Sequence, residues 1–403
     1  DYPLPPRVLA RRPPVPEESM KFDVVLVGGG RAGLALAVAL KRNHLSIALV
    51  EARAPVAPAD WDTRIYALSP ANARFLDRIG AWSHLDSARM TPVAAMEIHG
   101  DAGGRLDFAA YDAGVPELAW IVEASLMQRE LWETARRQGN VTLFCPGVPR
   151  GLTFSDEAAT LTLADGRELT SKLIVAADGA DSWVRTAAGI AVNFKPYGQH
   201  GVVANFAIGK PHRQVACQWF RPDGILAYLP LPGNLMSIVW STPAAHAGEL
   251  LALSPPAFCD RVADAGQRRF GALSLVTPPA AFPLRLMRAP RMVAPRLALI
   301  GDAAHAIHPL SGHGINLGFQ DALVLAETLA ACPEYVDCGD LAWLRRYERA
   351  RKEEVVALQS VTDGLQKLFA PTAGPLPALR NIGLNLTQRL PFIKDALVRY
   401  AMG

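Results

Sequence analysis

The sequence predicts an α/β fold in which a parallel-sheet frame carries an inserted antiparallel β-sheet and ends in a helical tail. Two strand–turn–helix units, near residues 28 and 301, indicate the frame, because parallel strands are joined by helical crossovers. Short apolar runs separated by Gly, Pro and Asp between residues 201 and 240 indicate the antiparallel insertion. Apolar residues at helical spacing from residue 341 onward indicate the tail.

Composition narrows the class of protein. The chain has 403 residues, is 50% hydrophobic and carries a formal net charge of +3. Its Lys and Arg residues are scattered along the chain, so nothing supports nucleic-acid binding. Five cysteines without a CxxC pair predict free thiols in a reducing cytosol. No apolar run reaches spanning length and no secretory signal is visible, so we expect a cytoplasmic protein.

The first strand–turn–helix unit contains a G-x-G-x-x-G fingerprint. Gly28 permits the tight turn, Gly30 lets a pyrophosphate approach the backbone, and Gly33 lets the helix pack against the strand. Glu51 ends the next strand, where a carboxylate can accept hydrogen bonds from ribose hydroxyls. The flanking elements are the strand Phe22–Val27, the helix Leu34–Leu40 and the strand Ser46–Val50. The motif in this context predicts a dinucleotide site; the alternative is a chance cluster of glycines.

The chain then continues the frame up to residue 200. Ser69 before Pro70 marks a helix start, and this helix is expected to end near Ile79. Asp178-Gly179 follows a buried strand, and Asp-Gly is a turn signal in any protein. The other expected elements are strands Val93–His99 and Arg105–Phe108 of a second sheet, strand Trp120–Glu123, helix Ser125–Arg137, two strands around Leu152 and Leu161, and strand Lys172–Ala177.

The antiparallel insertion is expected to hold the substrate. Its strands are predicted at Val202–Ile208, Gln214–Phe220, Ile225–Leu231 and Leu235–Trp240, followed by helices around Gly248–Leu253 and Pro256–Gly271. Trp219, Tyr228 and Trp240 are candidates for lining a substrate pocket, although such an aromatic stripe is more often plain core. Phe282–Leu284 is expected to return to the frame.

The second strand–turn–helix unit reads GDAAHAIHPLSGHGINLGFQD from Gly301 to Asp321. A strand at Arg296–Ile300 precedes it, and a helix is predicted over Ile315–Ala331. Glycines ahead of a helix leave its N–H groups open to an electron-rich ring atom. The alternatives are an ordinary joint and a metal site, for which the candidate ligands are His305, His308 and His313. Pro309 and the glycines break any helix that would carry two of these histidines, and no cysteine or carboxylate cluster completes the set, so no metal is expected.

This stretch closely resembles the second flavin-binding motif of the single-component, FAD-dependent aromatic hydroxylases, and within them the ubiquinone-biosynthesis hydroxylases. Asp62-Thr-Arg64-Ile-Tyr-Ala-Leu-Ser69, the Asp178-Gly179 turn, Thr362–Leu365 and Arg380–Asn385 resemble the same group, so the resemblance covers Phe22 to Gly403. It implies that Asp302 holds the ribityl chain of FAD and that Arg64 lies near the flavin. Asp178 is implied near the pyrophosphate. Ala124 stands where relatives often have Asn or Arg, which leaves Gln128 as a weaker candidate for a cofactor contact. The residues implied around the flavin ring are Pro309, Gly312, Gly314, Ile315 and Asn316.

The fold expected from the resemblance is a Rossmann-like FAD-binding domain with an inserted antiparallel substrate domain and a helical C-terminal tail. Its expected divisions are 1–19 as a Pro-rich leader, 20–92, 120–195 and 284–350 as FAD-binding domain, 93–119 and 196–283 as substrate domain, and 351–403 as the C-terminal helical region. A single glycine-rich fingerprint leaves NAD(P)H without a Rossmann domain of its own, so this electron donor docks transiently or electrons come from a partner.

The expected activity is hydroxylation of a prenylated phenol by O2 and reduced flavin, in ubiquinone biosynthesis. A ubiquinone-biosynthesis protein complex and the edge of the inner membrane are the expected partners; the end of the chain is either a packed helix or an amphipathic docking face. Two alternatives stay open: a hydroxylase of a smaller soluble aromatic, and a non-catalytic FAD-binding assembly subunit.

Overall fold

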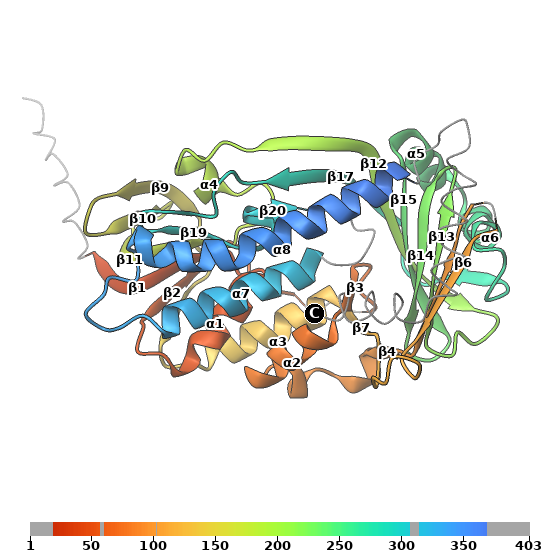
Figure 1. Cartoon of the computed structure of the whole chain (residues 1–403), viewed down its shortest axis with the longest axis horizontal. Helices are drawn as coiled ribbons and strands as arrows, with labels where there is room; N and C mark the ends of the chain where they lie inside the picture. Colours follow the sequence, from red (N-terminus) through yellow and green to blue (C-terminus); the bar gives the residue numbers. More distant parts are fainter. Residues whose placement is uncertain (1–18, 57–59, 102, 307–313, 369–403) are drawn as a thin grey trace, which may run out of the picture.

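The computed structural model describes residues 19–56, 60–101, 103–306 and 314–368. The molecule is elongated, with a helix-covered parallel sheet at one end and a large antiparallel sheet at the other (Figure 1). The long strands β12 and β17 run side by side between the two ends (Figure 1). The α/β fold with an inserted antiparallel sheet is therefore confirmed.

The frame is a sheet with the strand order β18-β19-β11-β1-β2-β8, in which the four pairings from β19 to β8 are parallel. The whole of β2 and the carboxyl-terminal halves of β1 and β11 are continuous runs of Val, Ile, Leu and Ala, as expected for a sheet covered on both faces. β9 and β10 extend β11 as an antiparallel ribbon. The strands are β1 (Met20–Val27), β2 (Ile47–Val50), β8 (Val141–Phe144), β9 (Pro149–Phe154), β10 (Ala159–Leu163), β11 (Glu168–Ala176), β18 (Val293–Ala294) and β19 (Leu297–Leu299).

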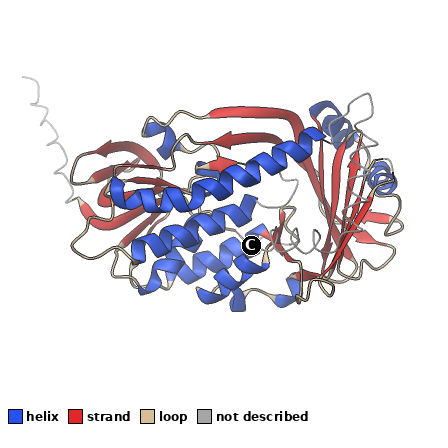
Figure 2. Cartoon of the chain, viewed as in Figure 1, coloured by secondary structure: helices blue, strands red, loops and turns tan. Residues whose placement is uncertain are grey.

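Helices gather around the frame, whereas the far end is mostly strand (Figure 2). Helix α1 packs against both α3 and α7, and α8 lies along α7. The expected cap of α2 is confirmed, because Ser69 accepts a hydrogen bond from the N–H of Asn72. The helices are α1 (Arg31–Ala39), α2 (Pro70–Arg78), α3 (Ala124–Arg136), α4 (Trp183–Ala187), α5 (Ala244–Ala252), α6 (Pro255–Ala265), α7 (Gly314–Ala330) and α8 (Leu341–Leu368).

The antiparallel sheet has the order β20-β17-β12-β15-β14-β13-β5-β6, with β16 paired to β12. One of its faces packs against α5 and α6 in a separate hydrophobic core. The other face meets a small sheet of order β3-β7-β4. The strands are β3 (Ile65–Leu68), β4 (Thr91–Val93), β5 (Ala95–His99), β6 (Arg105–Ala109), β7 (Ala119–Glu123), β12 (Asn193–Ile208), β13 (Val215–Arg221), β14 (Gly224–Leu231), β15 (Leu235–Pro243), β16 (Leu273–Leu275), β17 (Ala280–Arg288) and β20 (His305–Ala306).

Three expectations about the elements are corrected. Phe282–Leu284 does not return to the frame, because β17 stays paired with β12 up to Arg288. The predicted strand Val93–His99 is two strands in different sheets, since β4 pairs with β7 and β5 with β13. The tail begins with one helix, α8, which runs from Leu341 to Leu368, so the expected division between residues 350 and 351 falls inside it. Residues 1–18 and 369–403 lie outside the described part.

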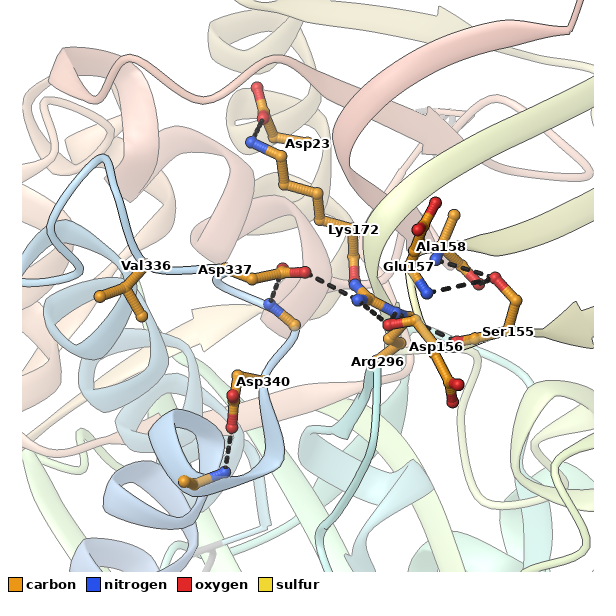
Figure 3. Close-up of polar contacts among 12 residues, drawn as sticks. Asp23, Ser155, Asp156, Glu157, Ala158, Lys172, Arg296, Val336, Asp337 and Asp340 are labelled. Atoms are coloured by element: carbon orange, nitrogen blue, oxygen red, sulfur yellow. Dashed lines mark hydrogen bonds and ion pairs between the residues drawn. The ribbon is translucent and has the colours of Figure 1, made fainter.

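Arg296 joins three parts of the frame (Figure 3). Its φ of +61° places it in the left-handed region, and its side chain is buried. Nε donates to the carbonyl oxygens of Ser155 and Asp156, and Nη1 donates to that of Lys172 at 3.0 Å. Nη2 donates to the Asp337 carboxylate at 2.7 Å. One guanidinium thus ties the β9–β10 turn and β11 to the segment before α8.

All five cysteines are free thiols. Among the helices of the described part, none combines the length and the apolar character needed to cross a bilayer.

Candidate functional site

The glycine-rich loop lies between β1 and α1, at the carboxyl end of the parallel strands. Gly28 has a φ of +111°, and a Cβ there would lie 2.4 Å from the carbonyl oxygen of Ala177. A Cβ on Gly33 would lie 2.3 Å from the carbonyl oxygen of Gly28, so α1 can pack on the loop only without a side chain. At Gly30 the nearest atom would be 3.8 Å away, which leaves room for a ligand. The first N–H groups of α1 have no intrahelical partner and are suited to an anion.

Two side chains fix this loop. The Glu51 carboxylate accepts hydrogen bonds from the N–H of Gly29 at 2.6 Å and from the N–H of Arg53 at 3.0 Å. Gln128 on α3 donates from Nε2 to the carbonyl oxygen of Gly29 at 2.8 Å. Glu51 is therefore held at the loop with lone pairs left for hydroxyl donors. The Nε2 of Gln128 is committed to the protein, so Gln128 positions the loop that faces the ligand.

The Asp178 turn is connected to the Asp302 motif. Asp178 accepts from the N–H of Val184 through Oδ2, whereas its Oδ1 is buried without a partner in the described part. Arg185 is buried and donates to the carbonyl oxygen of Ala303 at 2.9 Å, and burial lowers the pKa of its guanidinium. Asp302 lies in the 3-10 turn Gly301–Ala303, and its side chain is exposed. Two motifs that are remote in sequence are thus brought together by Arg185, which no sequence motif singles out.

The loop around Arg64 is fixed by two acids, the half-buried Asp62 and the buried Glu123. Asp62 accepts from the N–H of Arg64 at 2.9 Å and from the N–H of Ser125 at 2.9 Å. Glu123 is 1% exposed, accepts from the N–H of Asp62 and holds Arg89 through two charge-assisted hydrogen bonds of 2.6 and 2.7 Å. The Arg64 side chain itself is exposed. Sequence reasoning missed Glu123 and Arg89; an acid at the end of an apolar strand was the only signal.

The start of α7 is bound to the same region through Asn316. Its Oδ1 accepts from the N–H of Ser69 at 2.8 Å and from Asn72 at 3.0 Å, and its Nδ2 donates to the carbonyl oxygen of Ala67. This side chain is therefore committed to the protein, and what remains for a ligand is the backbone of the first turn. Ile315 is nearly buried, and a Cβ on Gly314 would meet open space. The predicted Pro309 and Gly312 lie outside the described residues.

A buried ionic cluster of Asp321, His305 and Arg351 is connected to the turn that carries Asp302. Asp321 on α7 is 0% exposed and accepts from the N–H of Gly301 at 2.9 Å. Its carboxylate also lies 2.7 Å from Nε2 of His305 and 2.7 Å from Nε of Arg351 on α8. Burial alone would raise the pKa of Asp321, but His305 and Arg351 hold it below its usual value. The sequence alone offers His305 as a candidate metal ligand and gives no sign of this ion pair.

No group of three metal-ligating side chains gathers in the part of the chain that the structure describes. His305 is committed to Asp321. His308 and His313 lie outside the described residues.

The three aromatic residues considered for a substrate pocket pack in a hydrophobic core. Trp219, Tyr228 and Trp240 are buried in the core between the antiparallel sheet and α5 and α6. The Tyr228 hydroxyl donates to the carbonyl oxygen of Val262 on α6 at 2.6 Å. Because side chains alternate along a strand, these three rings point away from the frame. All three rings therefore belong to this core, which is the alternative that the sequence left open for such an aromatic stripe.

The residues present fit FAD. The open backbone at Gly30, the orphaned Oδ1 of Asp178 and the exposed carboxylate of Asp302 all lie in segments that hydrogen bonds hold at the carboxyl end of the sheet. Ligands of open α/β sheets bind at this end. Gly30 and Glu51 would hold the dinucleotide part, and Asp302 would accept hydrogen bonds from a polyol chain.

Replacing Asp302 by alanine is expected to weaken FAD binding by about 1–3 kcal/mol, or roughly 5- to 150-fold, because a charge-assisted hydrogen bond is lost. The measurement is a titration of apoprotein with FAD, followed by flavin fluorescence. Asp302→Asn keeps one acceptor oxygen and should lose less. An unchanged dissociation constant in Asp302→Ala would remove this carboxylate from the site.

Comparisons with known proteins agree with this site. A family model described as "FAD binding domain" matches residues 21–361. The chain is 34% identical over 388 residues to the ubiquinone hydroxylase UbiL of Rhodospirillum rubrum, covering 94% of this chain and 89% of that protein. It is 33% identical to the 3-demethoxyubiquinol 3-hydroxylase of Escherichia coli, covering 94% and 98%. It is 32% identical to human ubiquinone biosynthesis monooxygenase COQ6, covering 94% and 92%.

Solved structures agree in fold. The p-nitrophenol 4-monooxygenase PnpA of Pseudomonas putida superimposes with a TM-score of 0.78 at 20% identity, covering 95% of this chain and 99% of that one. Klebsiella pneumoniae HpxO complexed with FAD and uric acid gives a TM-score of 0.70 at 17% identity, covering 94% and 97%. The expected resemblance is confirmed by the family model and the relatives over nearly the whole chain: this protein belongs to the FAD-binding monooxygenase family and is an FAD-dependent monooxygenase.

Proposed function

We propose that this protein hydroxylates the ring of a phenol carrying a long polyprenyl chain, on the route to ubiquinone. Support comes from the relatives: proteins at 32–34% identity over 94% of this chain are named as ubiquinone hydroxylases or ubiquinone-biosynthesis monooxygenases. The E. coli relative is matched over 98% of its own length. A shared whole-chain architecture is the reason to carry the substrate class over.

One observation in the structure supports the substrate class: over β13, β14, β15 and the last part of β12, the frame-facing side of the antiparallel sheet is uncharged. Every second residue from 203 to 207, 216 to 220, 225 to 231 and 235 to 241 faces this side, and none of them is Lys, Arg, Asp or Glu. A small aromatic acid needs a fixed cation to offset the cost of burying its carboxylate. A neutral ring with an apolar tail needs none, and each buried methylene contributes about 0.8 kcal/mol.

In this proposal bound FAD supplies the activation of O2, and the chain's own residues bind, orient and exclude water. Gly28, Gly30, Gly33 and Glu51 hold the adenosine and pyrophosphate part. Asp178 and Asp302 would hold the middle of the cofactor, and the first turn of α7 would offer its backbone N–H groups to the flavin. A helix start of this kind would stabilise negative charge on the flavin by about 0.3–1 kcal/mol.

We also propose an electron donor and partners for this protein. NAD(P)H is the proposed electron donor and docks transiently, because the chain has one glycine-rich fingerprint. A complex of ubiquinone-biosynthesis proteins and contact with the surface of the inner membrane are proposed partners, since a polyprenyl phenol resides in lipid.

The test is turnover of purified protein with NAD(P)H and O2 on two phenols, one bearing a farnesyl chain in detergent and one tailless phenol acid. We expect a hydroxylated product from the prenylated compound, and a stepwise loss of apparent affinity as the chain is shortened. Mass analysis of the product identifies the added oxygen.

Other outcomes separate the alternatives. Equal or better catalytic efficiency on the tailless acid would contradict the ubiquinone assignment and favour a soluble aromatic substrate. Bound FAD without any substrate-stimulated oxidation of NAD(P)H would favour an assembly subunit.

A further inference from the structure

Two buried polar side chains on the frame-facing side of the antiparallel sheet each carry one polar atom without a hydrogen-bond partner among the described residues. Asn205 on β12 is 0% exposed and Ser237 on β15 is 1% exposed. The Oδ1 of Asn205 and the Oγ of Ser237 have no hydrogen-bond partner among the described residues. Buried polar atoms are nearly always paired in folded proteins, so two orphans at one place call for a partner that binds.

The two residues are direct neighbours. Asn205 is the cross-strand partner of Ser237 in the antiparallel pairing of β12 and β15. Directly opposed side chains of such a pair point to the same side, with Cβ atoms about 4.5–5.5 Å apart. One polar group can therefore contact both.

The pair lies where the antiparallel sheet meets the frame. The Nδ2 of Asn205 donates to the carbonyl oxygen of Asp62 at 2.8 Å, and Asp62 holds the loop that carries Arg64. This bond fixes the amide orientation, so the orphaned atom of Asn205 is the acceptor Oδ1. Ser237 adds a hydroxyl, which donates or accepts.

Two aliphatic side chains adjoin the pair on the same side. Leu229 is the cross-strand partner of Ser237 and packs partly against the small sheet, and both Leu229 and Val239 are half-buried. A neutral polar pair beside half-buried aliphatic side chains is suited to a phenol with an apolar chain. The ring hydroxyl would contact the pair, and the apolar chain would extend along Leu229 and Val239.

We propose that Asn205 Oδ1 and Ser237 Oγ form the polar end of the substrate site and bind the ring hydroxyl of the phenol. This assignment rests on the proposed function. The phenol O–H donates to Oδ1 of Asn205, and the Ser237 hydroxyl donates to the phenol oxygen. Because both protein groups are neutral, the subsite selects a neutral phenol over an aromatic carboxylate.

The test compares two ligands in each variant: a farnesyl-substituted phenol and the matching farnesylbenzene, which lacks the hydroxyl. Their dissociation constants are measured in detergent from the change in flavin absorbance of the FAD-loaded protein. In the unaltered protein the phenol should bind more tightly. In Ser237→Ala and in Asn205→Leu the ratio of the two constants should fall about 3- to 10-fold, which corresponds to one neutral hydrogen bond.

Two controls separate binding from structural roles. Ser241→Ala removes a hydroxyl from the same side of β15, and it should leave the ratio unchanged. Ser171→Ala removes a buried hydroxyl that donates to the carbonyl oxygen of Leu173, and it should lower the melting temperature. Ser237→Ala should leave the melting temperature unchanged, because the Ser237 hydroxyl makes no hydrogen bond with the described residues that could be lost. The ratio is taken within one variant, so the lost Asp62 bond in Asn205→Leu does not imitate the effect.

The outcomes distinguish the two proposals. A hydroxylated product in the unaltered protein, with the same ligand ratio in Ser237→Ala and Asn205→Leu, would overturn the subsite alone. A lower melting temperature in Ser237→Ala with an unchanged ratio would assign the hydroxyl to the protein's own structure and also overturn it. No hydroxylated product from any phenol in the unaltered protein would overturn the proposed function, and the subsite with it.

Discussion

Replacing Gly33 by alanine is expected to weaken FAD binding at least about 100-fold. The added Cβ would lie 2.3 Å from the carbonyl oxygen of Gly28 and 2.9 Å from Cβ of Ala177, so α1 must move away from β1. Overpacking of this kind costs about 1–3 kcal/mol, and displaced N–H groups lose charge-assisted hydrogen bonds of similar worth. Titration of apoprotein with FAD measures the loss.

Gly248 provides a matched control, because it also lies inside a helix but a Cβ there would meet no atom within 4 Å. Gly248→Ala should leave FAD binding unchanged and raise stability by about 0.5–1 kcal/mol through helix propensity. Normal FAD affinity in Gly33→Ala would mean that the close packing of α1 on the loop is not required by the cofactor.

The elements around the cofactor could be predicted from the sequence because their signals are local. The strand before Gly28, the Ser69 cap and the start of α7 each depend on residues within one turn, and all three are present in the structure. The course of β17 and the end of α8 were not predicted, since β17 stays paired with β12 up to Arg288 and α8 continues to Leu368. No local sequence signal near Phe282 indicates that its strand stays paired with β12.

The site was only partly predictable for the same reason. Glu51 and Asp302 could be proposed from motifs, because the roles proposed for them require a fixed spacing. Arg185 and Asn205 donate hydrogen bonds to carbonyl oxygens of residues that are remote in sequence. No local sequence pattern predicts such contacts. The sequence left open whether the aromatic side chains of the antiparallel sheet lie in the core or line a pocket, because alternation shows that a strand has two sides but does not show which side meets the frame.

Replacing Asp321 by asparagine is expected to destabilise the protein by about 3–5 kcal/mol, because it leaves the buried Arg351 and His305 without their carboxylate. Denaturant unfolding followed by circular dichroism measures the loss. FAD binding should weaken as well, since Asp321 also fixes the N–H of Gly301 at the Asp302 motif.

The dependence on pH gives an independent check of this cluster. A carboxyl whose pKa is lowered by folding stabilises the protein above its unfolded pKa of about 3.9, and that contribution is lost as the pH falls through the lower folded value. The stability difference between the unaltered protein and Asp321→Asn should therefore be largest near neutral pH and shrink below about pH 4.

Two further variants separate the charge of Asp321 from its shape. Asp321→Asn combined with Arg351→Met removes the stranded cation and should recover part of the loss, giving a coupling energy that two independent sites would not show. Asp165→Asn breaks a solvent-exposed pair with Arg167 and should leave the unfolding midpoint unchanged. The contrary result would be a double variant whose loss of stability equals the sum of the losses in the two single variants. The cluster would then stabilise the fold by packing alone, and charge would not connect α8 to the turn that carries Asp302.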